Sequence, residues 1–135
     1  MTAKMKSKRY RKSTRSDWDK VRVKVMRWCL RVKLVQNWSS FSVLMLKTGS
    51  RPIVEESRKD DFWGAKPQDD GTLVGMNVLG RLLMELREQL QGADKDALRK
   101  VAAPEVPDFM LLGKRIGTVG PSNREASYVQ ESMFR

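Results

Sequence analysis

The chain of 135 residues contains no histidine and only one cysteine, Cys29. Without histidine, imidazole-based acid–base catalysis and the usual zinc and iron sites lack their ligands, and a lone cysteine cannot form an internal disulfide. No apolar run approaches the ~20 residues of a membrane-spanning helix, and no apolar segment follows the basic N-terminus as a signal peptide requires. We therefore expect no metal, no cofactor and a cytoplasmic location.

Motifs of several common enzyme classes are also missing. The chain has no phosphate-binding GxxxxGK[ST], no GxGxxG after a strand and no serine in a GxSxG turn. Its length leaves room for one domain with a modest core, and 40% hydrophobic and 32% charged residues are typical of a globular protein. Carboxylates therefore remain the main candidates for catalytic groups.

Positive charge is concentrated at the N-terminus. The net charge is +11, and residues 1–15 contain seven basic side chains and no acid. The seven are Lys4, Lys6, Lys8, Arg9, Arg11, Lys12 and Arg15. The rest of the chain is only mildly basic, with 20 basic and 16 acidic residues. Two interpretations stay open: a flexible arm that grips nucleic-acid phosphates without sequence preference, or a solvated leader or linker.

The spacing of apolar residues predicts a helix over 16–37, with Ser16 and Asp19 at the spacing of a capping box. One apolar face consists of Trp18, Val21, Val25, Trp28, Val32 and Val35. A basic stripe on the opposite side consists of Lys20, Lys24, Arg27 and Arg31. A further apolar strip consists of Val23, Met26, Leu30 and Leu34. Two apolar sides indicate that more protein than one neighbouring helix covers this helix, and hence a missing or partner surface.

A second helix is predicted over 76–91, with Gly92 as a left-handed C-cap. Gly80 within it indicates a close helix crossing, because an internal glycine is otherwise costly. The remaining predicted elements are a helix over 41–49 ended by Gly49, a strand over 51–57, a short helix over 93–101 and an extended segment over 106–117. Residues 58–75 lack periodicity, and loops of this length are often functional. We expect the domain to span 16–116 and the polar tail, 117–135, to be loose.

Acidic and aromatic residues gather in and before this long loop. Glu55 and Glu56 end the predicted strand, and Asp60 and Asp61 precede Trp63. Carboxylates beside a ribosyl centre can orient water and stabilise an oxocarbenium-like transition state, and a tryptophan ring can stack on a planar base. The alternative is that the acids are solvated and that the tryptophan covers the core. Spacing alone does not separate the two.

Four segments in fixed order resemble the NADAR domain family, also called YbiA-like. They are "DWDKVRVKVMRWCLRVKLVQN", "LMLKTG", "IVEESRKDDFWG" and "GMNVLGRLLMELRE". The resemblance implies a mainly helical α+β fold, of which this chain carries the C-terminal portion. It also implies an N-glycosidase that acts on riboflavin-biosynthesis intermediates or on ADP-ribosyl substrates, in a family linked to NAD metabolism.

The resemblance assigns roles to individual residues. A D-x-x-W-G motif falls on Asp60, Trp63 and Gly64, so Asp60 and, from V-E-x-S, Glu55 become the catalytic candidates. The substrate-binding candidates are Trp63, Gly64, Asn77, Thr48, Gly49 and Lys33. Asn77 has two open roles, either a helix cap or a hydrogen bond to the substrate. Lys33 either faces the site or faces solvent.

Family members carry an upstream half with an "SNF"-like segment and an E-H-x-x-Q-like motif whose glutamate is central to the chemistry. This chain begins after both motifs. Three explanations stay open: a truncated or mis-started gene product, a partner polypeptide that supplies the remainder, or a shortened relative without catalysis. The alternative function is therefore a non-catalytic module that binds a nucleotide or ADP-ribose and contacts nucleic acid through its basic arm. We also expect a partner chain or a homo-oligomer to cover the exposed apolar strip of the first long helix.

Overall fold

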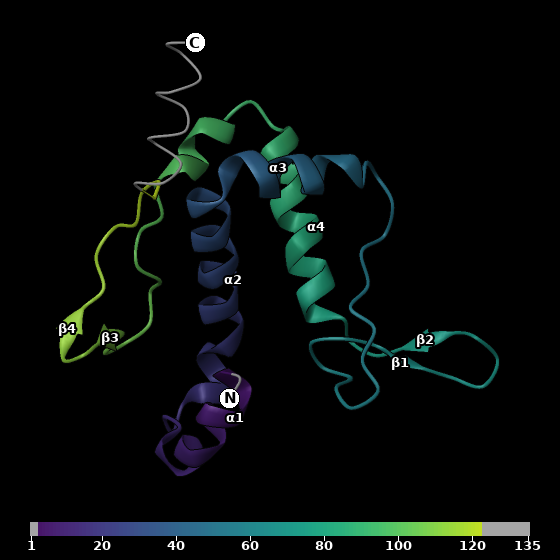
Figure 1. The fold of residues 1–135 in the computed structure, drawn as a ribbon, viewed down its shortest axis with the longest axis horizontal. Coiled ribbons are helices and arrows are strands. Elements are labelled where there is room, and N and C mark those ends of the chain that lie inside the picture. Colours follow the sequence, from purple (N-terminus) through teal and green to yellow (C-terminus); the bar gives the residue numbers. More distant parts are fainter. Residues whose placement is uncertain (1–2, 123–135) are drawn as a thin grey trace.

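The computed structural model describes residues 3–122, which form a small helical assembly flanked by two hairpins (Figure 1). The main helices are α2 (Trp18–Gln36), α3 (Trp38–Lys47) and α4 (Val78–Gln91). Shorter helical segments are α1 (Ala3–Ser7), η1 (Lys8–Ser13) and η2 (Lys95–Arg99). In Figure 1, α2 and α4 stand side by side and α3 crosses at their upper ends. Most of the predicted tail, residues 123–135, lies outside the described residues.

The core lies where α2, α3, α4 and η2 meet. Its buried side chains are Leu34, Phe41, Met45, Leu86, Leu90 and Leu98. Leu34 and its neighbour Val35 are the largest side chains with no exposed surface among the described residues. The hydrophobic core of the described chain is therefore small.

Helix α2 matches its predicted range, but its expected capping box is absent. Asp17 occupies the N-cap, where its carbonyl accepts the Lys20 and Val21 amides but its side chain makes no capping bond to the helix. It instead accepts two hydrogen bonds from the Arg15 guanidinium, at 2.5 and 2.9 Å. This contact lowers the pKa of the Asp17 carboxyl and raises that of Arg15. Arg15 also donates to the Pro107 carbonyl at 2.7 Å, so it is bound within the fold and differs from the other basic residues before it.

The apolar face of α2 that contains Trp28 is contacted by the segment after η2, whereas Leu30 and Leu34 of the further apolar strip pack in the core. Residues 101–119 run back along the helix, and the Val101 and Val119 backbones pair at 2.8 Å in both directions. Phe109 meets the Trp28 ring edge to face, with 5.1 Å between the ring centroids. Part of the surface that the sequence assigned to a missing or partner chain is therefore filled internally.

The range of helix α4 was predicted to within two residues, but the conformation of its C-cap and the reason for Gly80 were not. Gly92 is extended (φ −82°, ψ 170°), so the expected left-handed cap is wrong. Gly80 does mark a close approach, but not of another helix. A Cβ there would lie 2.2 Å from the Ile53 carbonyl oxygen and 2.4 Å from the Asn77 amide nitrogen. Glycine is needed because a loop carbonyl and the asparagine side chain occupy that space.

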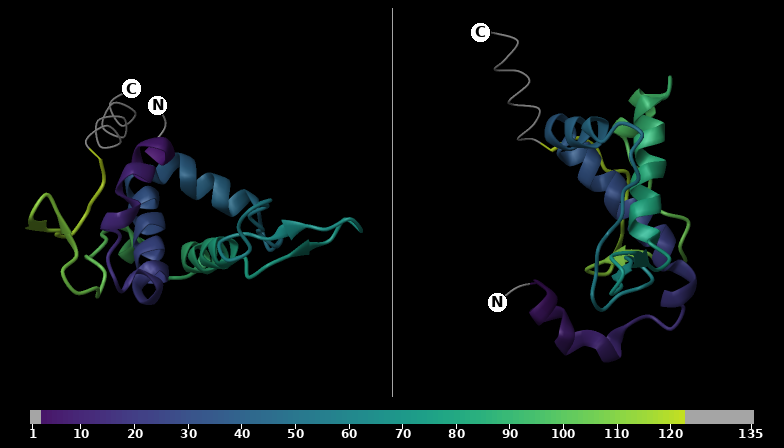
Figure 2. Two further views of the ribbon diagram at one scale, coloured as in Figure 1. Left: turned by 90° about the horizontal axis from the view of Figure 1, so that it is seen from below. Right: turned by 90° about the vertical axis from the view of Figure 1, so that its right-hand side faces the viewer.

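Two small antiparallel hairpins complete the described fold and point away from each other on opposite sides of the helices (Figures 1 and 2). Strands β1 (Lys66–Pro67) and β2 (Leu73–Val74) pair Lys66 with Val74. Strands β3 (Met110–Leu111) and β4 (Lys114–Arg115) pair Met110 with Arg115. The strand expected over 51–57 is wrong, because only an isolated bridge between Glu56 and Ala65 forms there. The overall class is nevertheless the predicted one, α+β and mainly helical.

Candidate active site

The backbone of the D-x-x-W-G segment caps helix α4. The N–H groups of residues 76–79, at the start of the helix, donate to the carbonyl oxygens of residues 61–64 at 2.7 to 3.1 Å. The first amides of a helix have no partner within it and must find one outside. Here the loop supplies acceptors for the N-cap and the first two helical residues, and for Met76 just before them, so the position of the loop and the start of the helix are determined together.

Asn77 joins a third segment to this junction. Its side-chain oxygen accepts the Glu55 N–H at 2.9 Å, and its side-chain amide donates to the Ile53 carbonyl at 2.9 Å. The amide thus pairs with the backbone as a neighbouring strand would. Asn77 stands at the N-cap with a left-handed backbone (φ 50°) but makes no capping bond with its side chain. The prediction of a side-chain cap is therefore wrong, and the reason is that both ends of the amide hold residues 53–55.

Asp60 organises the turn that carries Trp63. One carboxylate oxygen, Oδ1, accepts the N–H groups of Phe62 at 2.9 Å and of Trp63 at 2.8 Å. The Ser57 hydroxyl oxygen in turn accepts the Asp60 N–H at 3.1 Å. An aspartate that bonds backbone amides two and three residues ahead forms a local turn in place of regular structure. Asp60 is half-buried, whereas its neighbour Asp61 is exposed.

Gly64 allows the loop to lie directly against the residues before it. A Cβ at this position would lie 2.5 Å from the Glu55 carbonyl oxygen, closer than any side chain permits. The neighbouring Ala65 N–H donates to that same carbonyl at 2.8 Å. The backbone of Glu55 is therefore held on both sides, by Asn77 and by Ala65, while its side chain is exposed.

An arginine of α2 reaches this loop, which sequence reasoning missed. The Arg22 guanidinium lies over the Phe62 ring, 3.4 Å from its centroid, and Phe62 meets Trp63 edge to face at 4.8 Å. The buried Nε of Arg22 has no hydrogen-bond partner among the described residues. A cation over a ring face is favourable, so this contact joins the aromatic pair to the first long helix. Neither residue stood out in the sequence, because one belongs to a helix and the other is a spacer within the motif.

Three predicted binding residues lie away from this junction. Thr48 and Gly49 follow α3, and Gly49 has the left-handed backbone (φ 60°) expected of a residue that ends a helix. The Thr48 hydroxyl accepts a hydrogen bond at 2.8 Å from Arg87, which is buried and also donates to the Arg51 carbonyl at 2.7 Å. Arg87 is nine residues beyond Val78, about 14 Å along the helix. Lys33 is exposed in the last turn of α2, and its ammonium lies 5.0 Å from the Phe41 ring centroid.

The structure thus brings Glu55, Asp60, Trp63, Gly64 and Asn77 together at one end of α4. The Glu55 carboxylate is exposed, and Asp60 and Trp63 are half-buried. Carboxylates of this kind can bind and polarise a sugar, and a tryptophan ring can stack on the planar base attached to it. No cluster of acidic or cysteine side chains that would hold a metal ion occurs within residues 3–122. The groups available for chemistry at this junction are therefore carboxylates, and Asp60 is held in a hydrogen-bonded turn.

Comparison with known proteins identifies the family. The NADAR domain model matches residues 1–91, which is about two thirds of the chain. This chain belongs to the NADAR domain family. The family assignment and the mainly helical α+β fold predicted from the four sequence motifs are confirmed.

Named relatives are similar over slightly more than half of the chain. A riboflavin biosynthesis protein of Vibrio vulnificus is 44% identical over 85 residues, which is 63% of this chain and 22% of that protein. The N-glycosidase YbiA of Escherichia coli is 43% identical over 79 residues, 58% of this chain and 46% of that protein. An N-glycosidase of Nostoc punctiforme is 35% identical over 77 residues. The aligned part of this chain therefore spans about half the length of these N-glycosidases.

No solved structure matches the chain significantly. Among the described residues, no helix is both long and apolar enough to cross a membrane.

Proposed function

We propose that this chain forms one wall of an N-glycosidase site, which hydrolyses the bond between a ribose carbon and the nitrogen of a nucleotide-like small molecule. The observation that carries the proposal is the junction at α4. There, backbone bonds hold the loop bearing Asp60, Trp63 and Gly64 as a rigid unit beside Glu55. Relatives named N-glycosidase and riboflavin biosynthesis protein support the reaction class.

The roles follow from the contacts. Trp63 stacks on the base, because its backbone is fixed by Asp60 and its ring is braced by Phe62. Asp60 uses Oδ1 to hold the turn, which leaves Oδ2 to orient the ribose. The exposed Glu55 carboxylate lies near the ribose and stabilises positive charge that develops at the anomeric carbon. Water adds its hydroxyl to that carbon and its other proton to the departing nitrogen.

We propose phosphorylated ribosylaminopyrimidine intermediates of riboflavin biosynthesis as substrates, with ADP-ribosyl conjugates as the alternative. The first test is release of ribose 5-phosphate from the riboflavin intermediate by the folded 135-residue chain. Release that rises in proportion to protein concentration supports the proposal. Absence of release at high concentration of folded protein refutes it for this substrate, and the same assay with an ADP-ribosyl conjugate tests the alternative.

Variants of the two adjacent aspartates separate charge from turn geometry. Asp60→Asn keeps an oxygen that can accept the Phe62 and Trp63 amides but removes the negative charge. Asp60→Ala removes both. Asp61→Asn is the matched control, because Asp61 is exposed and outside these bonds. We expect activity to fall by at least about 100-fold in both Asp60 variants and to change less than about twofold in the control. Equal activity of wild type and Asp60→Asn would show that this carboxylate acts only on the turn.

The second candidate function is a binding module for ADP-ribose that contacts nucleic acid. It is favoured by the helical segment η1, whose basic side chains Lys8, Arg9, Arg11 and Lys12 are exposed, with no acidic residue in the segment. ADP-ribose binding without hydrolysis, together with nucleic-acid binding that weakens steeply with salt, supports the module. ADP-ribose binding that survives high salt places that ligand away from η1, because exposed phosphate contacts are screened.

A further inference from the structure

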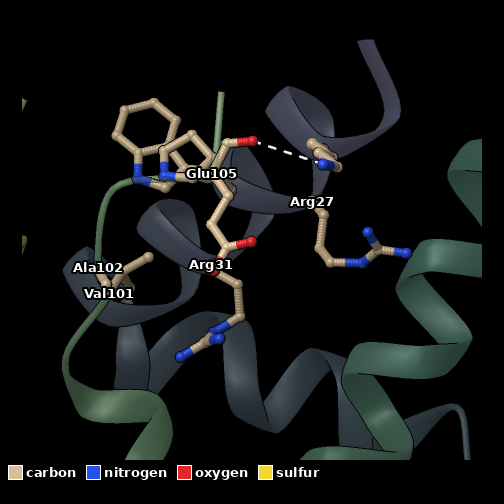
Figure 3. A pocket seen from close by; sticks show the side chains of 8 residues that line it. Arg27, Arg31, Val101, Ala102 and Glu105 are labelled. Carbon is tan, nitrogen blue, oxygen red and sulfur yellow. Dashed lines mark hydrogen bonds between the residues drawn. The ribbon is translucent and has the colours of Figure 1, made fainter. Parts of the chain in front are cut away.

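A cavity of about 270 Å³ lies between α2 and the segment after η2, and it shares no residue with the candidate active site. Lys24, Trp28 and Arg31 of α2 face Val101, Pro104 and Glu105 across it. Figure 3 shows Arg31 and Glu105 on facing walls, with Val101 and Ala102 beside them. The volume lies just below the range of about 300 to 1,000 Å³ for ligand pockets, so the cavity suits a sugar-sized ligand better than a dinucleotide.

Two buried donors of this pocket have no acceptor. The indole Nε1 of Trp28 and the guanidinium Nε of Arg31 are inaccessible to solvent and make no hydrogen bond to the described residues. Buried donors in native proteins are almost always paired, so each exception needs an explanation. Both side chains line the same cavity. Because neither nitrogen is exposed to solvent, an acceptor group bound in the cavity satisfies both only when the side chains that cover them turn aside.

The charges around the cavity favour an anion. Arg27 points toward α4, where it pairs with Glu85 at 2.8 Å, and is thereby neutralised (Figure 3). Lys24 and Arg31 form no ion pair within the described chain. They donate only to the Glu105 carbonyl at 3.5 Å and to the Lys100 carbonyl at 3.2 Å. Burial lowers the pKa of the Arg31 guanidinium, as expected of a desolvated cation without a counter-charge.

Glu105 opposes anion binding and sets the expected strength. Its side chain is exposed and extends toward Arg31 (Figure 3). A singly charged ligand would gain little from two cations beside one carboxylate. A phosphate monoester carries −1.5 to −2 charges at neutral pH and three strong acceptor oxygens, enough for a lysine, an indole N–H and an arginine N–H at once.

We propose that this pocket binds a small phosphate monoester. The phosphate accepts from Lys24, from Trp28 Nε1 and from Arg31 Nε, and the carbon skeleton lies on the apolar wall of Val101 and Pro104. Arg27 of the basic stripe on α2 thus faces α4, and Lys24 and Arg31 of the same stripe face residues 100–105 and become part of a site. The proposal does not depend on N-glycosidase activity, because it uses none of residues 53–65.

The test is a titration of the full chain with ribose 5-phosphate, followed by the tryptophan indole N–H signals in ¹H–¹⁵N NMR spectra. The chain has four tryptophans, so there are four such signals, and Trp28→Phe assigns the relevant one. At about 0.15 M salt, where diffuse attraction is screened, we expect the Trp28 signal to shift and saturate. Ribose without phosphate should leave it unmoved. An unmoved Trp28 signal with ribose 5-phosphate, or an equal shift with ribose, would overturn the proposal.

Lys24→Gln and Lys20→Gln form a matched pair, since both lysines are exposed on α2 one turn apart and each change removes one charge. Loss of a charge-assisted bond should weaken binding about tenfold or more in Lys24→Gln, and less than about twofold in Lys20→Gln. Glu105→Gln should tighten binding. If both lysine variants weaken binding equally, the attraction comes from the overall positive charge of the chain, and a specific site is refuted. Malate, a dicarboxylate without phosphate, serves as the comparison anion. Tighter binding of malate than of ribose 5-phosphate would contradict the proposal that the pocket prefers a phosphate monoester.

Discussion

Replacement of Asn77 tests the junction between the loop and α4 most directly. In Asn77→Gly, two hydrogen bonds to the backbone of Ile53 and Glu55 are lost, each worth about 1 kcal/mol net. Glycine adopts the left-handed backbone of position 77 freely. Asn77→Ala loses the same bonds and adds about 1 kcal/mol of backbone strain at φ 50°. We therefore expect losses in the free energy of unfolding of about 2 kcal/mol for glycine and about 3 kcal/mol for alanine.

Urea denaturation followed by far-ultraviolet circular dichroism measures both losses as shifts of the midpoint at an unchanged slope. Asn37→Ala is the control, because the Asn37 side chain makes one exposed bond to the Lys33 carbonyl at 2.9 Å and its φ is −135°. It should lose no more than about 1 kcal/mol. If Asn77→Ala loses no more free energy of unfolding than Asn77→Gly, the argument that the left-handed backbone at position 77 penalises alanine is refuted. A loss below about 0.5 kcal/mol in both would refute the side-chain bonds.

Three further predictions concern single side chains elsewhere in the fold. Arg87→Met should cost about 2 to 3 kcal/mol in the same urea assay, because it removes two hydrogen bonds that a buried guanidinium donates to the Thr48 hydroxyl and the Arg51 carbonyl; a loss below about 1 kcal/mol contradicts this. The contact with Arg15 lowers the pKa of Asp17 in the folded protein below its ordinary value of 3.8. The Asp17 carboxylate therefore stabilises the fold at pH values above 3.8, and this stabilisation is lost as the pH falls through the lower pKa of the folded state. Thermal melts should therefore show Asp17→Asn less stable than wild type at neutral pH and the difference vanishing in strong acid; equal stability of the two proteins at neutral pH would contradict this. Burial raises the pKa of the Cys29 thiol, so a disulfide reagent at mildly alkaline pH should modify it more slowly in the folded chain than in urea, and an equal rate would exclude that shift.

The long helices could be predicted because their signal is local. Residues three and four apart lie on one face of a helix, so the apolar spacing placed α2 and α4 within two residues of their observed bounds. The ordered motifs also identified the family, which the domain match over residues 1–91 confirms. These features depend on neighbours a few positions away, and the sequence displays such neighbours directly.

The predictions that failed depended on competition between partners. Ser16 and Asp19 had the spacing of a capping box, but Asp17 took the N-cap and paired with Arg15. Ile53 and Val54 favoured a strand, yet the backbone of residues 53–55 bonds to the Asn77 side chain, more than 20 positions away. Spacing rules state which bonds can form. They do not state which of several acceptors is closest after folding.

The helices follow from the periodicity of the sequence, the family from its four ordered motifs, and the residue types available for chemistry from its composition. Which of the candidates meet depends on the tertiary structure. Glu55, Asp60, Trp63 and Asn77 gather at the start of α4, since the loop carbonyls satisfy amides that the helix cannot pair itself. Thr48 binds Arg87 and Lys33 lies over Phe41, because packing of α3 against α2 and α4 carries them elsewhere.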